Sequence, residues 1–342
     1  MNHHYKNRSV RHQGAERFLV VAATVLLLAT GCRHPEPVRL YGEAQGTYYS
    51  IQYYDARQRN FQPQIDSLLD AFDQSASLWV DSSLLRRVNA GLTDSLDTIL
   101  SFLLSKSMDI CEYTHGAFDC RVGRLVQTWG FSFKQRQEPD STMLADLLKA
   151  ARGNIGIDGN RFCRQYPDTE LDFNAIAQGY ASDLVAQFLD AQGIDSYLVD
   201  IGGEVIARGS KANNRPWKVG IERPASDSLS APIVETAIPL VNRAVVTSGS
   251  YRKYYEKDGV KYSHTIDPAT GRPVTHSLLS VSVVEDECWL ADAMATAYMV
   301  MGLDSAKDFI ARHPEGPGTN AVFFIYDSCG SLVTYATPGF KK

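Results

Sequence analysis

Residues 171–183 read LDFNAIAQGYASD, a short apolar and acidic lead-in that runs directly into an amphipathic helix. Apolar residues recur every four positions behind it, which is typical of one helix face, at Ile176, Tyr180, Leu184 and Phe188. Asn174 is expected to cap this helix, because its side-chain oxygen can accept an orphan backbone N–H, and Gly193 is expected to end it. The N-terminus of such a helix suits a phosphate, although a buried helix with a polar cap also accounts for the stretch.

Residues 1–31 have the pattern of an export signal. A basic front precedes the apolar run 18–29, which is shorter than the ~20 residues that a membrane span needs. The run ends in Leu28-Ala29-Thr30-Gly31-Cys32, which resembles a bacterial lipobox with Ala29 at the usual leucine position. We therefore expect a lipoprotein signal peptide over 1–31, lipidation of Cys32, and an exported, membrane-anchored protein that faces the periplasm. The alternative is plain secretion with cleavage nearby.

The remaining chain is predicted to form a tether over 32–41 and one domain over 42–342. Removal of residues 1–31 takes away four basic groups and one acidic group, so the formal charge falls from −5 to −8. An acidic chain without a basic run argues against a nucleic-acid partner. Five further cysteines show neither CxxC nor zinc spacing, and the sequence cannot assign a disulfide among them. They are Cys111, Cys120, Cys163, Cys288 and Cys329.

The order of the expected elements favours an α+β fold, a single large domain of mixed sheets and helices, because no steady β-α-β rhythm is present. Helices are expected at 64–72, 97–113, 143–151, 290–301 and 307–311. Strands are expected at 48–54, 197–201, 204–208, 217–221, 244–247, 261–266 and 280–284, with a closing hairpin of 321–326 and 332–336.

Several segments between these elements have chemistry that suits a nucleotide. Trp79, flanked by turn residues, could cover a planar ligand, and Asp119 could accept from a ring N–H or a ribose hydroxyl. The glycines at 202–203 allow a phosphate or ring to approach the backbone. Hydroxyls, a glycine and an arginine at 247–252 suit a phosphate. Taken singly, each segment is also explained as an ordinary turn, loop or core residue.

Two further patches offer reactive groups. Asp292 and Thr296 are spaced i, i+4 and so share one face of an otherwise apolar helix. Hard oxygen atoms such as these are costly to bury without a partner, and Mg²⁺ is one partner that they could bind. The alternative is that Asp292 and Thr296 form a hydrogen-bonded pair on the helix surface. His264 precedes the turn 267–271 and can act as a base or as a phosphate donor near neutral pH.

Seven motifs in this order resemble the ApbE family, the FAD:protein FMN transferases, over about residues 42–336. The matching segments are Asp81–Asn89, Gly116–Phe131, Leu171–Asp183, Asp200–Glu204, Thr247–Tyr251, His264–Gly271 and Ala291–Thr296. The resemblance implies the α+β architecture of these flavin transferases. Gln45 and Gln178 depart from the family pattern, in which methionine and a charged Lys or Glu, respectively, are common.

The resemblance also implies roles for individual residues. Flavin contact is implied for Trp79, Ala117, Phe118, Asp119, Asp172, Gln178 and Ile266. Ser248 and Gly249 are implied to line the pyrophosphate of FAD. Metal binding is implied for the Ala175 carbonyl, Asp292 and Thr296. His264 is the implied catalytic histidine, with the neighbourhood of Asp292 as the alternative source of a base.

The implied reaction is the Mg²⁺-dependent transfer of FMN from FAD to a Ser or Thr hydroxyl of a target protein, with release of AMP. Implied targets are flavin-carrying subunits of membrane redox complexes, of the Na⁺-translocating NADH:quinone reductase or Rnf type. Two alternatives remain from the sequence. One is an Mg²⁺-dependent FAD pyrophosphatase that gives FMN and AMP, and the other is a flavin-binding lipoprotein without catalysis.

Overall fold

The computed structural model describes residues 1, 36–131, 139–224, 233–250, 254–257 and 260–340. The chain divides into two units, 1–36 and 37–342, and only Met1 and Glu36 of the first are described. Apart from Met1, the predicted signal peptide and the predicted lipidation site Cys32 therefore lie outside the described residues. The predicted tether is too long at its end, because Val38 already begins a strand. Among the described helices, none has the length and apolar character needed to cross a membrane.

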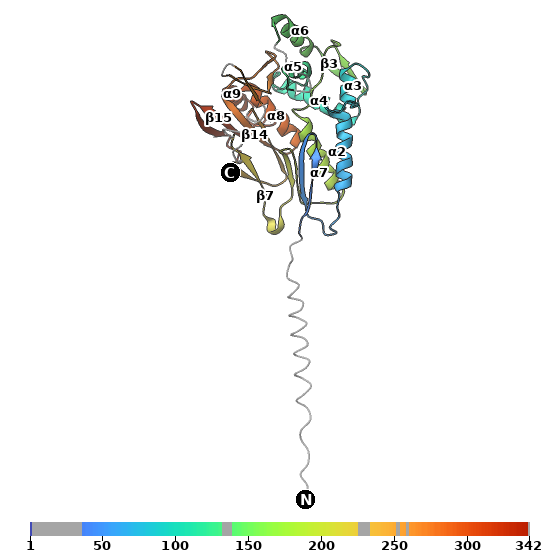
Figure 1. The fold of residues 1–342 in the computed structure, drawn as a ribbon. Helices are drawn as coiled ribbons and strands as arrows, with labels where there is room; N and C mark the ends of the chain where they lie inside the picture. Colours follow the sequence, from blue (N-terminus) through green and yellow to red (C-terminus); the bar gives the residue numbers. More distant parts are fainter. Residues whose placement is uncertain (2–35, 132–138, 225–232, 251–253, 258–259, 341–342) are drawn as a thin grey trace. The chain divides into compact units, whose positions relative to one another are not determined.

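The centre of the fold is an antiparallel eight-stranded sheet in the order β1-β2-β5-β6-β9-β14-β15-β16 (Figure 1). Its strands are β1 Val38–Ala44, β2 Thr47–Tyr53, β5 Tyr197–Ile201, β6 Glu204–Arg208, β9 Arg243–Gly249, β14 Leu278–Glu285, β15 Ala321–Ser328 and β16 Ser331–Ala336. The closing hairpin of β15 and β16 confirms the prediction. β1 was not predicted, since it falls in the stretch interpreted as a tether.

Four two-stranded pairs accompany this sheet. They are β3 Ile155–Asp158 with β4 Arg161–Arg164, β7 Trp217–Glu222 with β8 Val234–Leu240, β10 Tyr254–Lys257 with β11 Val260–Ser263, and β12 Ile266–Asp267 with β13 Arg272–Pro273. The prediction of one strand over 261–266 is wrong. The Ser263 hydroxyl accepts the Thr265 amide at 3.1 Å, and this local bond turns the chain at His264.

The predicted helices at 64–72, 143–151, 290–301 and 307–311 are each longer in the structure, whereas the helix predicted at 97–113 begins one residue later. The described helices are α2 Gln62–Ala76, α3 Leu84–Asn89, α4 Thr98–Tyr113, α5 Gly123–Thr128, α6 Ser141–Ala151, α7 Ala177–Ala191, α8 Cys288–Met301 and α9 Leu303–Arg312. Asp97 and Asp140 cap α4 and α6 by accepting amides of the first turn.

The start of α7 differs from the prediction. Asn174 is exposed in the turn before the helix, which begins at Ala177, so Asn174 is not the cap. Instead the buried Asp172 carboxylate accepts the Asn174 amide at 2.8 Å and closes that turn. The predicted end is confirmed, because Gly193 follows the last turn at φ +75°, where glycine is unstrained.

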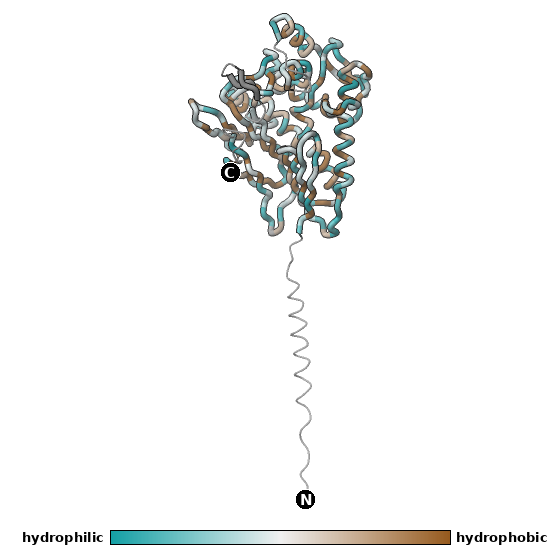
Figure 2. Tube along the Cα trace, viewed as in Figure 1, coloured by the Kyte–Doolittle hydropathy of each residue, from teal (hydrophilic) through white to brown (hydrophobic). Residues whose placement is uncertain are grey.

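The main apolar core lies between one face of the sheet and the helices α2, α4, α7 and α8. α7 packs on β5 and β6, and α8 packs on β9 and β14. The other face of the sheet is covered at Val205 and Val245 by Trp217 and Ile238 of the β7–β8 pair. In Figure 2 the apolar residues, in brown, recur along the sheet and along the helices that cover it. α7 and α8 are thereby held side by side on the same face of the sheet.

Candidate active site

α7 and α8 approach each other closely at Gly179. A Cβ atom on this residue would lie 2.6 Å from the carbonyl oxygen of Cys288 and 2.8 Å from the Cα of Trp289. Such contacts are too short for any side chain, so glycine is required for the two backbones to meet here. The Gly179 amide donates to Asp292 Oδ2 at 3.1 Å, which joins the two motifs that the sequence had placed 113 residues apart.

Asp292 is a buried carboxylate, with 5% of its surface exposed. Its pKa is raised to about 7, chiefly because burial disfavours the charged form; the Gly179 amide lowers it and the nearby Asp183 raises it. No Lys or Arg of the described residues forms an ion pair with it. A carboxylate buried without a counter-ion is costly, and such groups concentrate at functional sites.

Thr296 follows Asp292 by one helical turn and meets the sheet. Its Oγ1 lies 3.3 Å from Oγ of Ser248 on β9. The alternative of an Asp292–Thr296 pair on the helix surface does not describe this arrangement, since Asp292 is buried and each residue has a different partner. The structure therefore brings together Ser248, Asp292 and Thr296, three of the residues predicted from separate motifs.

Ala175 precedes Gly179 by four residues. In a regular α-helix its carbonyl would accept the Gly179 amide, but that amide is directed at Asp292. This leaves a backbone carbonyl at the start of α7, next to the turn that Asp172 closes. A carbonyl, a carboxylate and a hydroxyl are hard oxygen donors of the kind that Mg²⁺ takes. Within the described ranges, no three His, Cys, Asp or Glu side chains form a metal-binding group.

Gln178 lies against the turn between β5 and β6. A Cβ on Gly202, which has φ +65°, would lie 2.8 Å from Nε2 of Gln178 and 2.7 Å from Cγ2 of Thr47. In the same turn, Asp200 Oδ1 accepts the Gly203 amide at 2.9 Å. Gly202 therefore allows the protein's own Gln178 to approach its backbone, whereas nothing lies within 4 Å of a Cβ placed on Gly203; the approach of a phosphate or ring to this turn stays a prediction.

The segment around Asp119 is tied to the lead-in of α7. The amide of Asp172 donates to the Cys120 carbonyl at 2.8 Å. Burial raises the pKa of Asp172 to about 6, which the Asn174 amide partly offsets. Both Asp119 oxygens accept from Arg121, through the Arg121 amide, Nε and Nη2. Phe118 is buried in the main core, and Ala117 packs against that core.

The other predicted flavin and catalytic residues lie on separate elements. Trp79 is 60% exposed between α2 and α3. Ile266 is buried beside Trp129 and Leu125 in a small satellite core. His264 is half-buried in the turn between β11 and β12, with its ring 6.4 Å from that of Phe131. His264, between β11 and β12, and Trp79, between α2 and α3, thus lie on different elements from Asp292, which is on α8.

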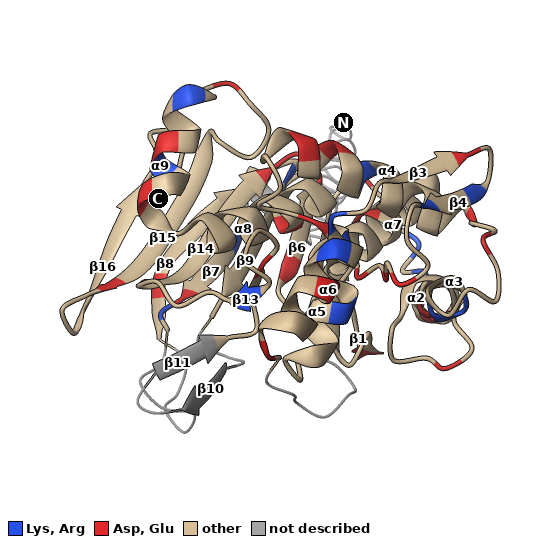
Figure 3. Ribbon diagram, turned by 90° about the horizontal axis from the view of Figure 1, so that it is seen from above, with Lys and Arg blue, Asp and Glu red and all other residues tan. Residues whose placement is uncertain are grey.

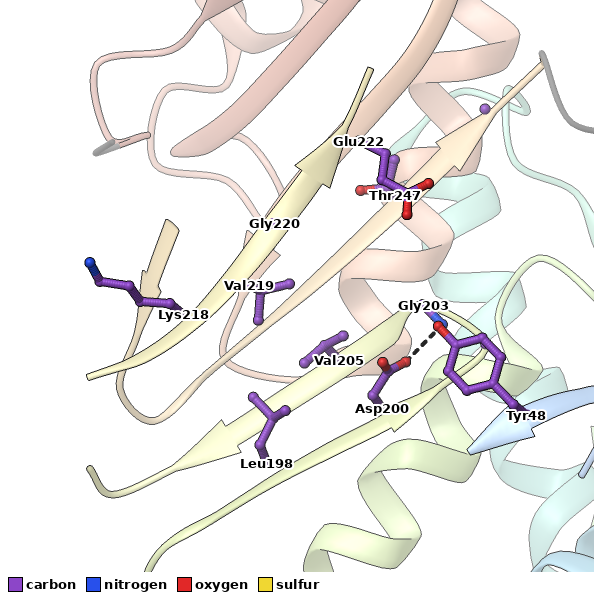
Figure 4. A pocket seen from close by; sticks show the side chains of 12 residues that line it. Tyr48, Leu198, Asp200, Gly203, Val205, Lys218, Val219, Gly220, Glu222 and Thr247 are labelled. Atoms are coloured by element: carbon purple, nitrogen blue, oxygen red, sulfur yellow. Dashed lines mark hydrogen bonds between the residues drawn. The ribbon is translucent and has the colours of Figure 1, made fainter. Parts of the chain in front are cut away.

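A cavity of about 320 Å³ lies on the opposite face of the sheet from α8 (Figure 4). Alternation along β9 points Ser248 towards α8, whereas Thr247 and Gly249 line this cavity. Asp200 and Tyr48 lie at its edge, and the apolar lining residues come from two layers: Leu198, Val205 and Val219. Figure 3 shows acidic and basic residues interspersed over the elements drawn in colour.

Two residues of the site were missed by the reasoning on the sequence, Gly179 and Asp183. Asp183 is buried on α7 and accepts the amides of Cys288 and Trp289. Both residues lie in the stretch 171–183, four positions apart. That spacing was a usable signal, because it places a small residue and a carboxylate on one face of the helix.

The ApbE family model matches residues 45–323 of the chain. An FAD:protein FMN transferase of Vibrio cholerae is 38% identical over 337 residues, covering 95% of this chain and 98% of the relative. Another, of Escherichia coli K12, is 34% identical and covers 94% of this chain and 96% of the relative.

Solved structures agree with this result. The flavin transferase ApbE from Vibrio cholerae has a TM-score of 0.77 at 32% identity, with 89% of this chain and 98% of that chain covered. The apo flavinyl transferase ApbE from Pseudomonas stutzeri has a TM-score of 0.80 at 30% identity, with 90% and 97% covered. The fold is thus that of the flavin transferases. The chain belongs to the ApbE family.

Proposed function

We propose that the protein is an FAD:protein FMN transferase, which moves FMN from FAD to a Ser or Thr hydroxyl of a target protein and releases AMP. Family membership over nearly the whole chain supports the activity. The observation that carries the assignment of the site is the position of Asp292. It is a buried carboxylate without a counter-ion among the described residues, held against Gly179 and one turn from the paired hydroxyls of Thr296 and Ser248.

The donor atoms around Asp292 fit a magnesium ion, which the family resemblance implies. Asp292, Thr296 and the Ala175 carbonyl would hold it, since Mg²⁺ accepts one or two carboxylates together with other oxygens and substrate phosphates. A bound cation also accounts for a carboxylate whose burial is otherwise unfavourable. When bound, the ion would offset the negative charge of the pyrophosphate as its P–O bond breaks.

The chain's own residues position the substrate in this proposal. Ser248 lies near the end of β9 beside Thr296 and would offer its hydroxyl to the pyrophosphate, while Gly249, the last residue of β9, would let the pyrophosphate approach the strand end. Trp79, exposed between α2 and α3, would cover the flavin ring. Asp172, Asp119, Gln178 and Ile266 are proposed as further flavin contacts. Gln178 would contribute hydrogen bonds without charge, because it stands where charged residues are common in the family.

The transfer step is a substitution at the phosphorus of the FMN half of FAD. A bond forms from the acceptor hydroxyl oxygen to this phosphorus, and the bond to the bridging oxygen of AMP breaks. The acceptor hydroxyl gives up its proton to a base, for which we propose His264, and AMP leaves with the electron pair. Positioning accounts for most of the catalysis in such transfers, and a general base contributes roughly 10²–10⁴-fold.

The location and targets are proposed from the sequence. The basic front, the short apolar run and Gly31-Cys32 support a lipid anchor at Cys32 on an exported protein. A membrane-anchored enzyme would meet flavin-carrying subunits of membrane redox complexes, of the Na⁺-translocating NADH:quinone reductase or Rnf type. The anchor would also keep enzyme and target in the same compartment.

The direct test is mass spectrometry of a candidate acceptor peptide after incubation with the protein, FAD and Mg²⁺. Transfer adds the mass of FMN less one water to a Ser or Thr of the peptide. Loss of FAD with FMN and AMP as products, and an unmodified peptide, would identify a pyrophosphatase instead. Bound but intact FAD would identify a flavin-binding protein. A parallel reaction with EDTA tests whether a divalent cation is needed.

A further inference from the structure

Two carboxylates on α7 and α8 each accept backbone amides of the opposite helix. Asp183 Oδ1 accepts the Cys288 amide at 2.9 Å, and its Oδ2 accepts the Trp289 amide at 2.8 Å. In the other direction, Asp292 Oδ2 accepts the Gly179 amide at 3.1 Å. Both pairs, 179/183 and 288/292, are separated by one helical turn, so the four residues form a reciprocal clasp.

The clasp provides hydrogen-bond acceptors for the first backbone amides of α8. The first amides of a helix have no acceptor within the helix. Glu287, the residue at the N-cap position of α8, makes no side-chain capping bond. Asp183 therefore caps α8 from the neighbouring helix. A cap of this kind joins two elements, because its carboxylate cannot keep both bonds if α8 shifts along α7.

The clasp also determines where Asp292 lies. Cys288 and Trp289 begin the helical turn that leads to Asp292. Because Asp183 holds their amides, it determines the position of this turn along the helix axis and its rotation about that axis, both relative to α7. Gly179 allows the close approach from the other side. Both oxygens of Asp183 are already engaged by α8, which makes Asp183 a poor candidate for a direct ligand.

We propose that Asp183 is a positioning residue that holds Asp292 in the geometry needed for divalent-cation binding, by clasping the start of α8 to α7. The proposal rests on the proposed function, in which Asp292 is a metal ligand. Residues that orient metal ligands typically affect metal affinity by roughly 10–100-fold when they are replaced. A role in stability alone would leave that affinity unchanged.

The test compares Asp183→Asn with a matched control on the same helix. Asparagine keeps the size of the side chain but has one acceptor oxygen, and its NH₂ would face a backbone amide. Asp190→Asn is the control, because Asp190 also lies on α7 and accepts a hydrogen bond, from the Tyr197 hydroxyl at 2.9 Å, away from α8. Wild type and Asp292→Asn complete the set.

Two readouts are measured for each full-length variant with FAD present. The first is Mn²⁺ affinity by electron paramagnetic resonance, which does not depend on turnover. The second is the Mg²⁺ concentration for half-maximal transfer, with kcat at saturating Mg²⁺. Asp183→Asn should weaken both affinities by roughly 10–100-fold and keep kcat within a few-fold. Asp190→Asn should lower the Tm without changing either affinity.

These measurements distinguish the positioning role of Asp183 from the metal-ligand role of Asp292. Wild-type Mn²⁺ affinity in Asp183→Asn, with Asp292→Asn impaired, would overturn the positioning role and leave the metal site intact. Wild-type affinity in Asp292→Asn would instead overturn the metal site. If Asp183→Asn does not fold, hydrogen exchange on the wild-type protein decides. The Cys288 and Trp289 amides should exchange as slowly as those in the middle of α8, and rapid exchange of both would refute the clasp.

Discussion

Ser248 on β9 and Thr296 on α8 place their hydroxyl oxygens 3.3 Å apart, although 48 residues separate them in the chain. The contact links the sheet to the helix face that carries Asp292. The proposed pyrophosphate-binding strand end and the proposed metal ligands therefore belong to one site.

Replacement of Asp292 by alanine should abolish Mg²⁺-dependent FAD cleavage and leave the fold intact. The carboxylate is buried and has no ion-pair partner in the part of the chain that the structure describes, so its removal relieves a desolvation cost while it deletes the proposed metal ligand. The measurement is AMP release together with the Tm. Asp304→Ala, at an exposed carboxylate on α9, is the control. Unchanged AMP release by a folded Asp292→Ala protein would refute the metal-ligand role.

Gly179→Ala should destabilise the protein by about 1–3 kcal/mol, the usual cost of an added group in a tightly packed interior. The new Cβ would lie 2.6 Å from the Cys288 carbonyl oxygen, and backbone atoms cannot yield as a flexible side chain can. Chemical denaturation measures the change. Gly156→Ala on β3 is the matched control, because nothing lies within 4 Å of its Cβ position, and it should be close to neutral. Equal stabilities of the two variants would contradict the close helix contact.

The stability of the metal-free protein should depend on pH through Asp172. The pKa of this carboxyl is about 6 in the folded protein against 3.8 as the ordinary value, so the folded state binds the proton more tightly. Below pH 4 the protonated Asp172 carboxyl contributes at most about 3 kcal/mol to the free energy of unfolding. This contribution is lost as the pH rises to about 6.

Asp172→Asn isolates this effect. The asparagine oxygen can still accept the Asn174 amide, so the turn is retained without the titrating group. Between pH 4 and 6.5 the free energy of unfolding of the wild type should fall relative to that of the variant. Parallel curves for the two proteins would show that Asp172 does not titrate in this range.

His264→Ala distinguishes three roles of the histidine. A general base predicts normal FAD affinity and a transfer rate lower by roughly 10²–10⁴-fold. A phosphate-binding cation predicts that affinity and rate fall together, and a structural histidine predicts a lower Tm with a near-normal rate per folded molecule. We expect the first result. The control is His313→Ala, because that ring packs on Phe309, where a structural role is evident. Normal transfer by folded His264→Ala would exclude catalysis by this residue.

Cys32→Ser should release the protein from the membrane fraction or leave it uncleaved. The expectation follows from the short apolar run and the small residue before Cys32, which a lipoprotein-processing pathway requires. Metabolic labelling with a palmitate analogue measures the modification directly. The free thiol Cys163, which is exposed, provides a matched Cys163→Ser control that should stay anchored. Absence of label on the wild-type protein would refute lipidation.

The sequence by itself determined the family and the residue types of the candidate site. Ordered motifs identified Asp292, Thr296 and Ser248 because the chemistry of a carboxylate or hydroxyl is local to its residue. Apolar periodicity likewise identified the helices, the closing hairpin and the end of α7 at Gly193, because those signals act over one or two turns.

The tertiary structure alone decided which of these groups meet. The local pattern predicts Asn174 as the cap of α7, but in the structure Asn174 is exposed in the preceding turn and its own amide donates to the buried Asp172, since burial is a property of the whole fold. The clasp of Asp183 on α8 joins residues more than 100 positions apart. Nothing in a local pattern encodes such a pair, because the close approach of α7 and α8 arises only when both pack on one face of the same sheet.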